Sequence, residues 1–205
     1  MKLRDFVVGA IRTESVVQDF YCGGKNLNSR LVHGAIGLIT EAGEFLDSLK
    51  KTLFYEKDKD DLNLKEEVSD MMWYVAILCD VMGWDMEDLA FKALIVADLD
   101  MKVDFKASDT EFEGRLLFSG KDMCEAASEF LGLVLSGAIE EYLQSKLIEV
   151  LRAMGILLHF LDSSFEDEAQ RNHDKLKIRY PEKFTSEAAL NRNIEAEKVA
   201  MEGGK

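Results

Sequence analysis

Two pairs of acidic residues in this chain have a spacing that favours metal binding. Glu41 and Glu44 lie three residues apart, and Glu67 and Asp70 repeat that spacing further along. Residues three apart share one face of a helix, so two packed antiparallel helices would direct all four carboxylates into one volume. Two carboxylates about 4 Å apart repel each other by roughly 4 kcal/mol at an effective dielectric of about 20. Four converging carboxylates therefore require bound cations, and the pattern predicts a divalent metal site.

The residues that flank these pairs distinguish them from an ordinary acidic surface. With 39 acidic residues in a chain of 205, about 7 pairs of this spacing are expected by chance. Small or apolar residues surround Glu41 and Glu44, however, and Asp70 opens the apolar run from Met71 to Leu78. A solvated helix face stays open as the alternative, because acidic pairs on such a face need no ligand.

The elements that position these residues are predicted to be helices. Pro181 is the only proline, and apolar residues recur every three or four positions through long segments, which is typical of helices. Asp85 follows Gly83 and Trp84, and we expect it to cap the start of a helix. The pattern predicts an all-α helical bundle, with helices over residues 2–21, 29–56, 62–82, 85–101, 121–137, 139–161, 164–179 and 185–201.

The first acidic pair shares its helix face with other polar residues. Steps of three or four from His33 pass through Glu41 and Glu44 and reach Lys51 and Tyr55. A cation and a phenol would then extend the metal site along the helix. The alternative is that Lys51 only extends toward solvent at the helix end.

An aromatic residue accompanies the second acidic pair. Trp73 lies one turn beyond Glu66 and Asp70. A tryptophan beside a metal site can stack on a nucleobase. A place in the hydrophobic core would equally explain it, and both interpretations stay open.

Composition limits the possible functions. A chain of 205 residues can bury the core of one domain or of two small ones. Its net charge of −14 argues against nucleic acid as a partner, because phosphate backbones bind Lys- and Arg-rich surfaces. No membrane span or signal peptide is indicated, so we expect a cytoplasmic protein that does not bind membranes. The cysteines form no zinc-type spacing, and no phosphate-binding glycine loop is present.

A weak internal repeat links the two parts of the chain. The segment Glu41-Ala-Gly-Glu-Phe-Leu46 returns as Glu125-Ala-Ala-Ser-Glu-Phe-Leu131, and residues 81–90 parallel residues 160–169. This alignment places Lys146 opposite Glu67 and Glu149 opposite Asp70. It predicts an internally duplicated pseudo-dimer packed as one globular unit, in which residues 1–104 carry the metal site and residues 105–205 form a degenerate second half. Amphipathic helices that merely look alike are the alternative.

Only the second half continues into a basic segment. Asn172, Lys175 and Arg179 fall on one helical face at steps of three and four. Such a face could clamp phosphate oxygens, with arginine acting as a planar fork and lysine as a point charge. Basic residues at a helix end also stabilise the helix dipole, which is the simpler interpretation.

Together these blocks resemble the MazG-like branch of the all-α nucleoside triphosphate pyrophosphohydrolases, whose pattern is ExxE, a spacer and ExxD. The resemblance rests on residues 31–51, 63–75 and 172–184. The ending Ala188-Ala-Leu-Asn-Arg-Asn193 also looks like that of phage-encoded and bacterial relatives. It implies cleavage of a (deoxy)nucleoside triphosphate between its α and β phosphates, giving a monophosphate and pyrophosphate. A phage-encoded member would act in the host cytoplasm.

The resemblance also implies roles for individual residues. Two or more Mg²⁺ ions, which Mn²⁺ could replace, would bind Glu41, Glu44, Glu67 and Asp70, as expected for a cation that prefers oxygen ligands. Glu44 is our choice for the residue that orients or deprotonates the attacking water. Nucleotide contacts would come from Lys51, Tyr55, Trp73, Asn172, Lys175, Arg179 and Tyr180. Relatives form dimers or tetramers, and for a homo-oligomer of this chain a dimer is favoured over a tetramer; an internal duplication could also take the place of one such interface.

The chain departs from the family in residues 84–160, which separate the ExxD helix from the Asn-x-x-Lys-Leu segment. Duplication would explain this insertion, and we expect one active site per chain, completed across the two halves. The insertion could instead displace Lys175 from the metals. Three alternatives stay open: a dUTPase-like hydrolase of di- and triphosphates, a phosphoribosyl-ATP pyrophosphatase, and a non-catalytic helical interaction protein.

Overall fold

The computed structural model describes residues 1–15, 18, 20–55, 57–104 and 112–203, and this part of the chain is mostly helical. Its elements in chain order are α1 (Leu3–Arg12), β1 (Phe20–Cys22), β2 (Lys25–Leu27), α2 (Ser29–Tyr55), α3 (Asp61–Met82), α4 (Met86–Asp104), α5 (Phe112–Ser136), α6 (Glu140–Phe160), α7 (Phe165–Arg179), α8 (Ser186–Leu190) and α9 (Ile194–Met201). The predicted helical class is therefore confirmed, with one small β hairpin added.

Local signals explain where the central helices begin and end. The Asp60 side chain accepts a hydrogen bond from the backbone N–H of Asn63 at the start of α3, and Gly83 ends that helix with a left-handed φ of 70°. The predicted cap at Asp85 is confirmed, since its carboxylate accepts from the backbone N–H of Glu87 at 2.9 Å. These caps satisfy backbone groups that a helix end leaves unpaired.

The expected helix over residues 2–21 is wrong in its second half. The helix α1 ends at Arg12, and β1 pairs antiparallel with β2, with Phe20 opposite Leu27. Gly23 and Gly24 both have positive φ, of 57° and 78°, as a tight two-residue hairpin turn requires. Helical periodicity misses this turn, because the glycine pair reverses the chain before a helix can continue. Residues 16, 17 and 19 of the expected helix lie outside the described residues.

Three other expected helices differ from the structure by more than one residue, and one of them, over 85–101, extends to Asp104. The expected helix over 121–137 begins earlier, at Phe112. The expected helix over 185–201 is two helices, because the Asn193 side chain accepts from the backbone N–H of Ala196 and starts α9 anew. The expected helix end at residue 56 lies outside the described residues.

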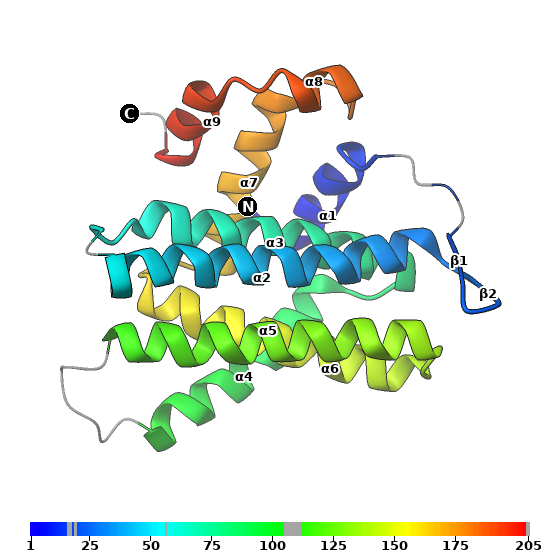
Figure 1. The fold of residues 1–205 in the computed structure, drawn as a ribbon, viewed down its shortest axis with the longest axis horizontal. Helices are drawn as coiled ribbons and strands as arrows, with labels where there is room; N and C mark the ends of the chain where they lie inside the picture. The colour runs from blue at the N-terminus through cyan, green and yellow to red at the C-terminus, as the bar shows by residue number, and fades with distance from the viewer. Residues whose placement is uncertain (16–17, 19, 56, 105–111, 204–205) are drawn as a thin grey trace.

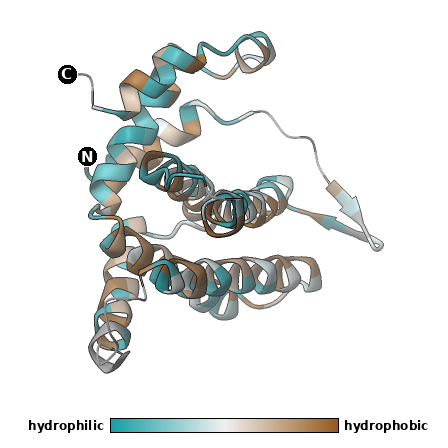
Figure 2. Cartoon of the chain, turned by 60° about the vertical axis from the view of Figure 1, so that its left-hand side comes forward, coloured by the Kyte–Doolittle hydropathy of each residue, from teal (hydrophilic) through white to brown (hydrophobic). Residues whose placement is uncertain are grey.

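Two long helical hairpins form the body of the molecule. The helix α2 packs against both α3 and α5, and α5 packs against α6. The hairpins lie one above the other (Figure 1), while the β1–β2 hairpin projects from one end (Figures 1 and 2). Buried side chains such as Phe45, Met71, Phe130 and Leu147 fill the core. At the crossing of α2 and α5, a Cβ on Gly120 would lie 2.8 Å from Leu46, so glycine allows the two helices to approach closely.

The helix that follows each hairpin in the sequence packs on the other hairpin. The helix α4 follows α3 but packs mainly on α6, whereas α7 follows α6 but packs on α3. The helices α1 and α9 then pack on α7. Segments far apart in the sequence, α3 and α7 above all, are therefore neighbours.

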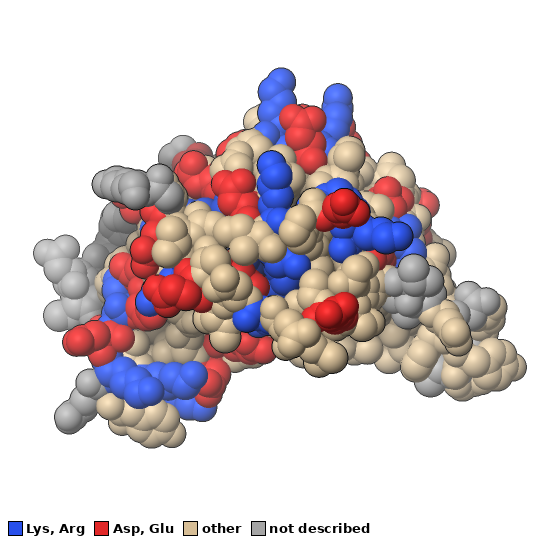
Figure 3. Space-filling view, turned by 90° about the horizontal axis from the view of Figure 1, so that it is seen from above, with Lys and Arg blue, Asp and Glu red and all other residues tan. Residues whose placement is uncertain are grey.

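The surface is not uniformly acidic despite the net charge of −14. The upper face in Figure 1 is seen from above in Figure 3, and Lys and Arg side chains there stand among the acidic ones. Within the described ranges, no helix combines the length and apolar character that crossing a bilayer requires.

Candidate active site

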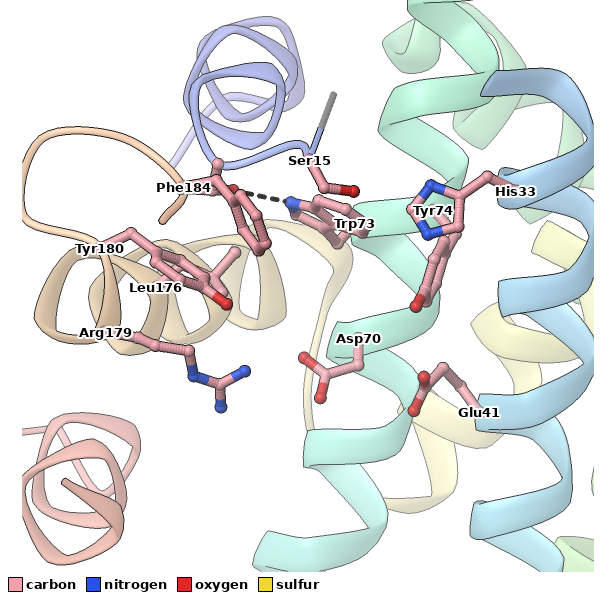
Figure 4. A pocket seen from close by; sticks show the side chains of 11 residues that line it. Ser15, His33, Glu41, Asp70, Trp73, Tyr74, Leu176, Arg179, Tyr180 and Phe184 are labelled. Atoms are coloured by element: carbon pink, nitrogen blue, oxygen red, sulfur yellow. Dashed lines mark hydrogen bonds between the residues drawn. The ribbon is translucent and has the colours of Figure 1, made fainter. Parts of the chain in front are cut away.

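Three of the four predicted metal ligands converge where α2 faces α3. One carboxylate oxygen each from Glu41, Glu67 and Asp70 lies within 4.8 Å of the others. Glu41 projects from α2 toward Asp70 on α3 (Figure 4). The i, i+3 spacing of Glu67 and Asp70 places both on the α3 face that meets α2. The two acidic pairs are therefore neighbours in space, as the antiparallel packing predicts.

Burial and repulsion raise the pKa values of two of these carboxyl groups. Desolvation, followed by the charges of Asp70 and Glu44, raises the pKa of Glu41 to about 7. Desolvation, followed by the charges of Asp70, Glu44 and Glu41, raises the pKa of Glu67 to about 8. Glu44 itself is exposed, at the rim of the cluster. A divalent cation would relieve this repulsion.

The donor set fits the cation that the resemblance implies. All donors are carboxylate oxygens, the hard ligands that Mg²⁺ and Mn²⁺ accept. Histidine and cysteine, which would favour zinc, do not belong to the cluster of Glu41, Glu67 and Asp70. Glu44 is exposed, so water can reach this side of the cluster, as a Mg²⁺ ion that keeps several of its waters requires.

Asp70 is also held from α7 by a buried lysine and asparagine. Lys175 Nζ lies 2.5 and 2.6 Å from the two Asp70 oxygens and 3.2 Å from Glu66 Oε1. Asn172 Nδ2 donates to Asp70 Oδ1 at 2.6 Å. Lys175 is 1% exposed, and the attraction of Asp70 and Glu66 outweighs desolvation and raises its pKa. The long segment between α3 and α7 therefore does not displace Lys175 from the carboxylates.

A pocket of about 240 Å³ opens beside the carboxylates (Figure 4). It lies between the end of α1, α2, α3 and the segment from α7 to Phe184. Its lining combines aromatic rings with two of the acids: Thr13, Ser15, His33, Glu41, Asp70, Trp73, Tyr74, Leu176, Arg179, Tyr180 and Phe184. Apolar walls with a few converging polar groups are typical of small-molecule sites.

Hydrogen bonds and ring contacts fix the aromatic wall. Trp73 Nε1 donates to Thr13 Oγ1 at 2.9 Å and lies 3.2 Å from the Ala10 carbonyl. The rings of Trp73, Tyr74 and His33 meet edge to face, with centroids 4.9 to 6.0 Å apart. Edge-to-face contacts of this kind are favourable and stabilise the orientation of the rings. Trp73 is thus held by its neighbours and also lines the pocket, and its stacking on a nucleobase stays a prediction.

Glycine and histidine on α2 complete that wall. A Cβ on Gly37 would lie 2.1 Å from the Tyr74 ring, so only glycine accommodates this ring position. His33 Nδ1 is buried without a hydrogen-bond partner among the described residues. Burial lowers the pKa of His33, which favours the neutral imidazole with one donor and one acceptor nitrogen.

The structure separates two predicted contacts from the pocket. Lys51 lies further along α2 and pairs with Asp47 at 2.8 Å, and Tyr55 is 62% exposed. Neither lines the pocket. By contrast, Trp73, Arg179 and Tyr180 do line it, and Asn172 and Lys175 hold Asp70.

Several pocket residues were not assigned from the sequence. Tyr74, Thr13, Ser15, Leu176 and Phe184 line the pocket, and His33 was placed on the ligand face without a role. The periodic signal could have identified Tyr74, which follows Asp70 by one helical turn. No periodic signal relates Thr13 or Phe184 to the acids, since packing of separate elements brings them there.

A second polar cluster occupies the place that the repeat assigns to a second site. Lys146 Nζ lies 2.5 Å from Glu149 and 2.6 Å from Glu129. Arg152 pairs with Asp100 at 2.8 Å and with Asp122 at 3.3 Å. Here the acids already have cationic side chains as partners.

The geometry defines a helical protein with a carboxylate cluster able to hold a metal ion beside an aromatic pocket. Residues 35–95 match the model of the MazG nucleotide pyrophosphohydrolase domain. The match begins within α2, includes all of α3 and ends within α4, so it contains all four predicted metal ligands and excludes α7. The resemblance is confirmed for this segment. No curated protein matches the chain, and no solved structure matches it.

Proposed function

We propose that the protein hydrolyses a (deoxy)nucleoside triphosphate to the monophosphate and pyrophosphate in a Mg²⁺-dependent reaction. The observation that carries the proposal is the cluster of Glu41, Glu67 and Asp70, which lies beside an aromatic pocket and contacts buried Lys175. Its position within the segment that matches the MazG domain supports the same reaction.

Four acidic residues are proposed to hold the ions. Glu41, Glu67 and Asp70 would supply the inner ligands, and Glu44 would complete the set from the rim. Mg²⁺, in two or more ions per site, supplies charge neutralisation of the phosphate oxygens and activation of water. Mn²⁺ would substitute for it, because it accepts the same oxygen ligands. Glu44 is proposed to orient or deprotonate the attacking water, since its exposure gives water access to it.

The pocket suggests how the nucleotide lies. The base would pack against Trp73 and Tyr180, with the phosphates directed toward Asp70 and the basic residues of α7. Asn172 and Lys175 would act chiefly by holding Asp70 in position. Roles for Lys51 and Tyr55 stay predictions, and these residues would reach only a group that extends out of the pocket along α2.

The packing of the helices supports the proposed duplication. In a pseudo-dimer, each half would contribute equivalent helices, and the reciprocal crossing of α4 onto α6 and of α7 onto α3 has this relationship. Residues 1–104 would form the half with the metal site and residues 105–205 the degenerate half. The boundary adjoins residues 105–111, which lie outside the described residues. An assembly of two whole chains also stays a prediction.

Pyrophosphate release from a panel of (deoxy)nucleoside triphosphates tests the function. We expect release that requires Mg²⁺ and stops with a chelator. Asp70→Asn should lose about a hundredfold or more in activity, since removing outer-shell supports of a metal already costs roughly 10–100-fold and Asp70 is proposed as a direct ligand. Glu149→Gln is the matched control, because the repeat aligns Glu149 with Asp70, and it should keep its activity. Activity without a divalent ion, or an equal loss in both variants, would contradict the proposal.

Product identity separates the related chemistries. A pyrophosphohydrolase acting between the α and β phosphates gives pyrophosphate, and it leaves diphosphates intact. Hydrolysis of dUDP would instead support the dUTPase-like alternative. Activity restricted to phosphoribosyl-ATP would support the phosphoribosyl-ATP pyrophosphatase alternative. Chromatography of the products decides among them.

A further inference from the structure

Arg179 is the only Lys or Arg side chain lining the pocket in the described part of the chain. It ends α7, and its guanidinium points into the space between α7 and α3 (Figure 4). A pocket that already contains Glu41 and Asp70 would repel a polyphosphate unless a cation offsets their charge. Arg179 is therefore the pocket's own source of positive charge toward an anionic substrate.

A carboxylate from another helix holds Arg179 by two bonds. Arg179 Nε donates to Glu197 Oε1 at 3.0 Å, and Nη2 donates to Glu197 Oε2 at 2.5 Å. Glu197 belongs to α9, and its side chain is only 3% exposed. A bidentate pair of this kind fixes the plane of the guanidinium as well as its position.

One edge of the guanidinium stays available. Within the described residues, Arg179 Nη1 donates no hydrogen bond, whereas Nε and Nη2 are both used by Glu197. An arginine carries five N–H donors, two of them on Nη1. Glu197 therefore orients Arg179 and leaves donors for another acceptor.

A second arginine keeps this unit positively charged. Arg192 Nη2 donates to Glu197 Oε2 at 2.8 Å, so one carboxylate serves two guanidiniums. The trio of Arg179, Arg192 and Glu197 has a net charge of +1 because each arginine stays protonated. Glu197 thus positions Arg179 without cancelling the charge of the trio.

We propose that Glu197 is a positioning residue of the substrate site, which holds Arg179 so that its Nη1 edge receives phosphate oxygens of the substrate. The helix α9 is then part of the binding site although it lies far from the carboxylates in the sequence. This inference rests on the proposed function, since it assigns the polyphosphate of that substrate to Arg179. Glu197 touches no substrate atom and acts only through Arg179.

The experiment measures binding of inorganic pyrophosphate with Mg²⁺ to the full chain by calorimetry. Glu197→Gln removes the charge at nearly constant shape and should weaken binding about tenfold, the effect of losing one oriented charge-assisted contact. In turnover assays KM should rise by a similar factor while kcat stays within about twofold, because the metal cluster is intact. Glu195→Gln, at an exposed position of the same helix, should bind like the wild type.

A double-variant cycle tests whether Glu197 acts through Arg179. Adding Glu197→Gln to Arg179→Gln should cause no further loss of pyrophosphate affinity, since the group that Glu197 positions is gone. Additive losses would overturn the inference, as would unchanged or tighter binding in Glu197→Gln alone. If Glu197→Gln does not fold, Glu197→Asp, which keeps the charge but withdraws it by one methylene, should weaken binding in the same direction.

The outcomes separate this inference from the proposed function. A wild-type protein that binds pyrophosphate through Arg179, with Glu197 positioning that arginine, but releases none from any nucleotide would refute the function alone. An active wild-type protein whose KM does not change in Glu197→Gln would refute only the role of Glu197.

Discussion

At the scale of single residues, Asp70 connects the two parts of the site. It belongs to the carboxylate cluster and accepts hydrogen bonds from Asn172 and Lys175. Lys175 is nearly inaccessible to solvent, so its ammonium depends on Asp70 and Glu66 for compensation. A buried lysine with two acidic partners is thus both a structural group and a neighbour of the proposed metal ions.

Replacing that lysine should destabilise the fold. Lys175→Met leaves Asp70 without its cation, and we expect the free energy of unfolding to fall by about 3 kcal/mol. This value is at the low end for a broken buried ion pair, because Asp70 is partly exposed. Chemical unfolding without divalent ions measures this loss. Lys177→Met, at an exposed position of the same helix, is the control. Equal stability of the two variants would show that the Lys175 contacts contribute nothing.

The pKa of Glu197 predicts a pH dependence of stability. Burial raises this pKa, but hydrogen bonds from Arg179 and Arg192 outweigh burial and lower it from 4.5 to about 2. A carboxyl group whose pKa is depressed by folding stabilises the folded state above its ordinary pKa and loses that contribution as the pH falls toward the folded value. The difference in Tm between wild type and Glu197→Gln should therefore be constant above 4.5 and narrow as the pH falls toward about 2.

Melting curves over that pH range provide the measurement. Glu195→Gln is the control variant of the same series, because no arginine pairs with Glu195 in the part of the chain that the structure describes. A difference for Glu197→Gln that widens on acidification would contradict the assigned ion pairs.

At the scale of helices, the contact between α2 and α3 shapes the aromatic wall. Gly37→Ala would place a Cβ 2.1 Å from the Tyr74 ring, so the ring must move and stability should fall by about 1–3 kcal/mol. The nucleotide KM of Gly37→Ala should also rise, because Tyr74 lines the pocket. Unfolding and steady-state kinetics on one preparation measure both effects.

The same helix offers a matched control. A Cβ on Gly43 would meet nothing within 4 Å, so Gly43→Ala should stabilise the helix by about 0.5–1 kcal/mol through its better propensity. If Gly37→Ala also stabilised the protein and left KM unchanged, Tyr74 would not depend on this close approach.

Helix positions could be predicted from the sequence wherever local signals determined them. The expected 62–82 helix matches α3 (Asp61–Met82) closely because Asp60 and Gly83 cap it. The β1–β2 hairpin was not predicted, because the apolar periodicity of the preceding residues indicates a helix, whereas the two glycines with positive φ form a turn. Likewise, the start of α9 depends on one capping asparagine, Asn193.

Site residues divide in the same way. Spacing on one helix identified Glu67 and Asp70, and the same reasoning placed Trp73 beside them. The relation of Glu197 to Arg179 could not be found, because it depends on how α9 packs on α7 rather than on any repeat. The close approach of the Tyr74 ring, which allows only glycine at position 37, likewise depends on the register between α2 and α3.

At the scale of the whole molecule, the two halves differ in how their acids are compensated. In the first half, Glu41 and Glu67 remain without a cationic side chain bonded to them in the described part of the chain. In the second, Lys146 pairs with Glu129 and with Glu149, the residue that the repeat aligns with Asp70. We therefore predict one Mg²⁺-dependent nucleotide site per chain.

Calorimetric titration with a non-hydrolysable nucleotide analogue measures this number. The expected stoichiometry is one analogue per chain in wild type, and Asp70→Asn should abolish the binding while Glu149→Gln preserves it. Two equivalent sites would contradict both the assignment and the interpretation of the second cluster.

The crossing of α7 onto α3 has a consequence for how such a chain can diverge. Under the proposed duplication, the second copy was free to lose its acids, because the first copy kept a full set. It was not free to lose α7, since Asn172, Lys175 and Arg179 serve the acids and pocket of the first copy. On that proposal, natural selection would act on the second half through a site in which it holds no metal, and its acidic helices should vary among descendants more freely than its last long helix.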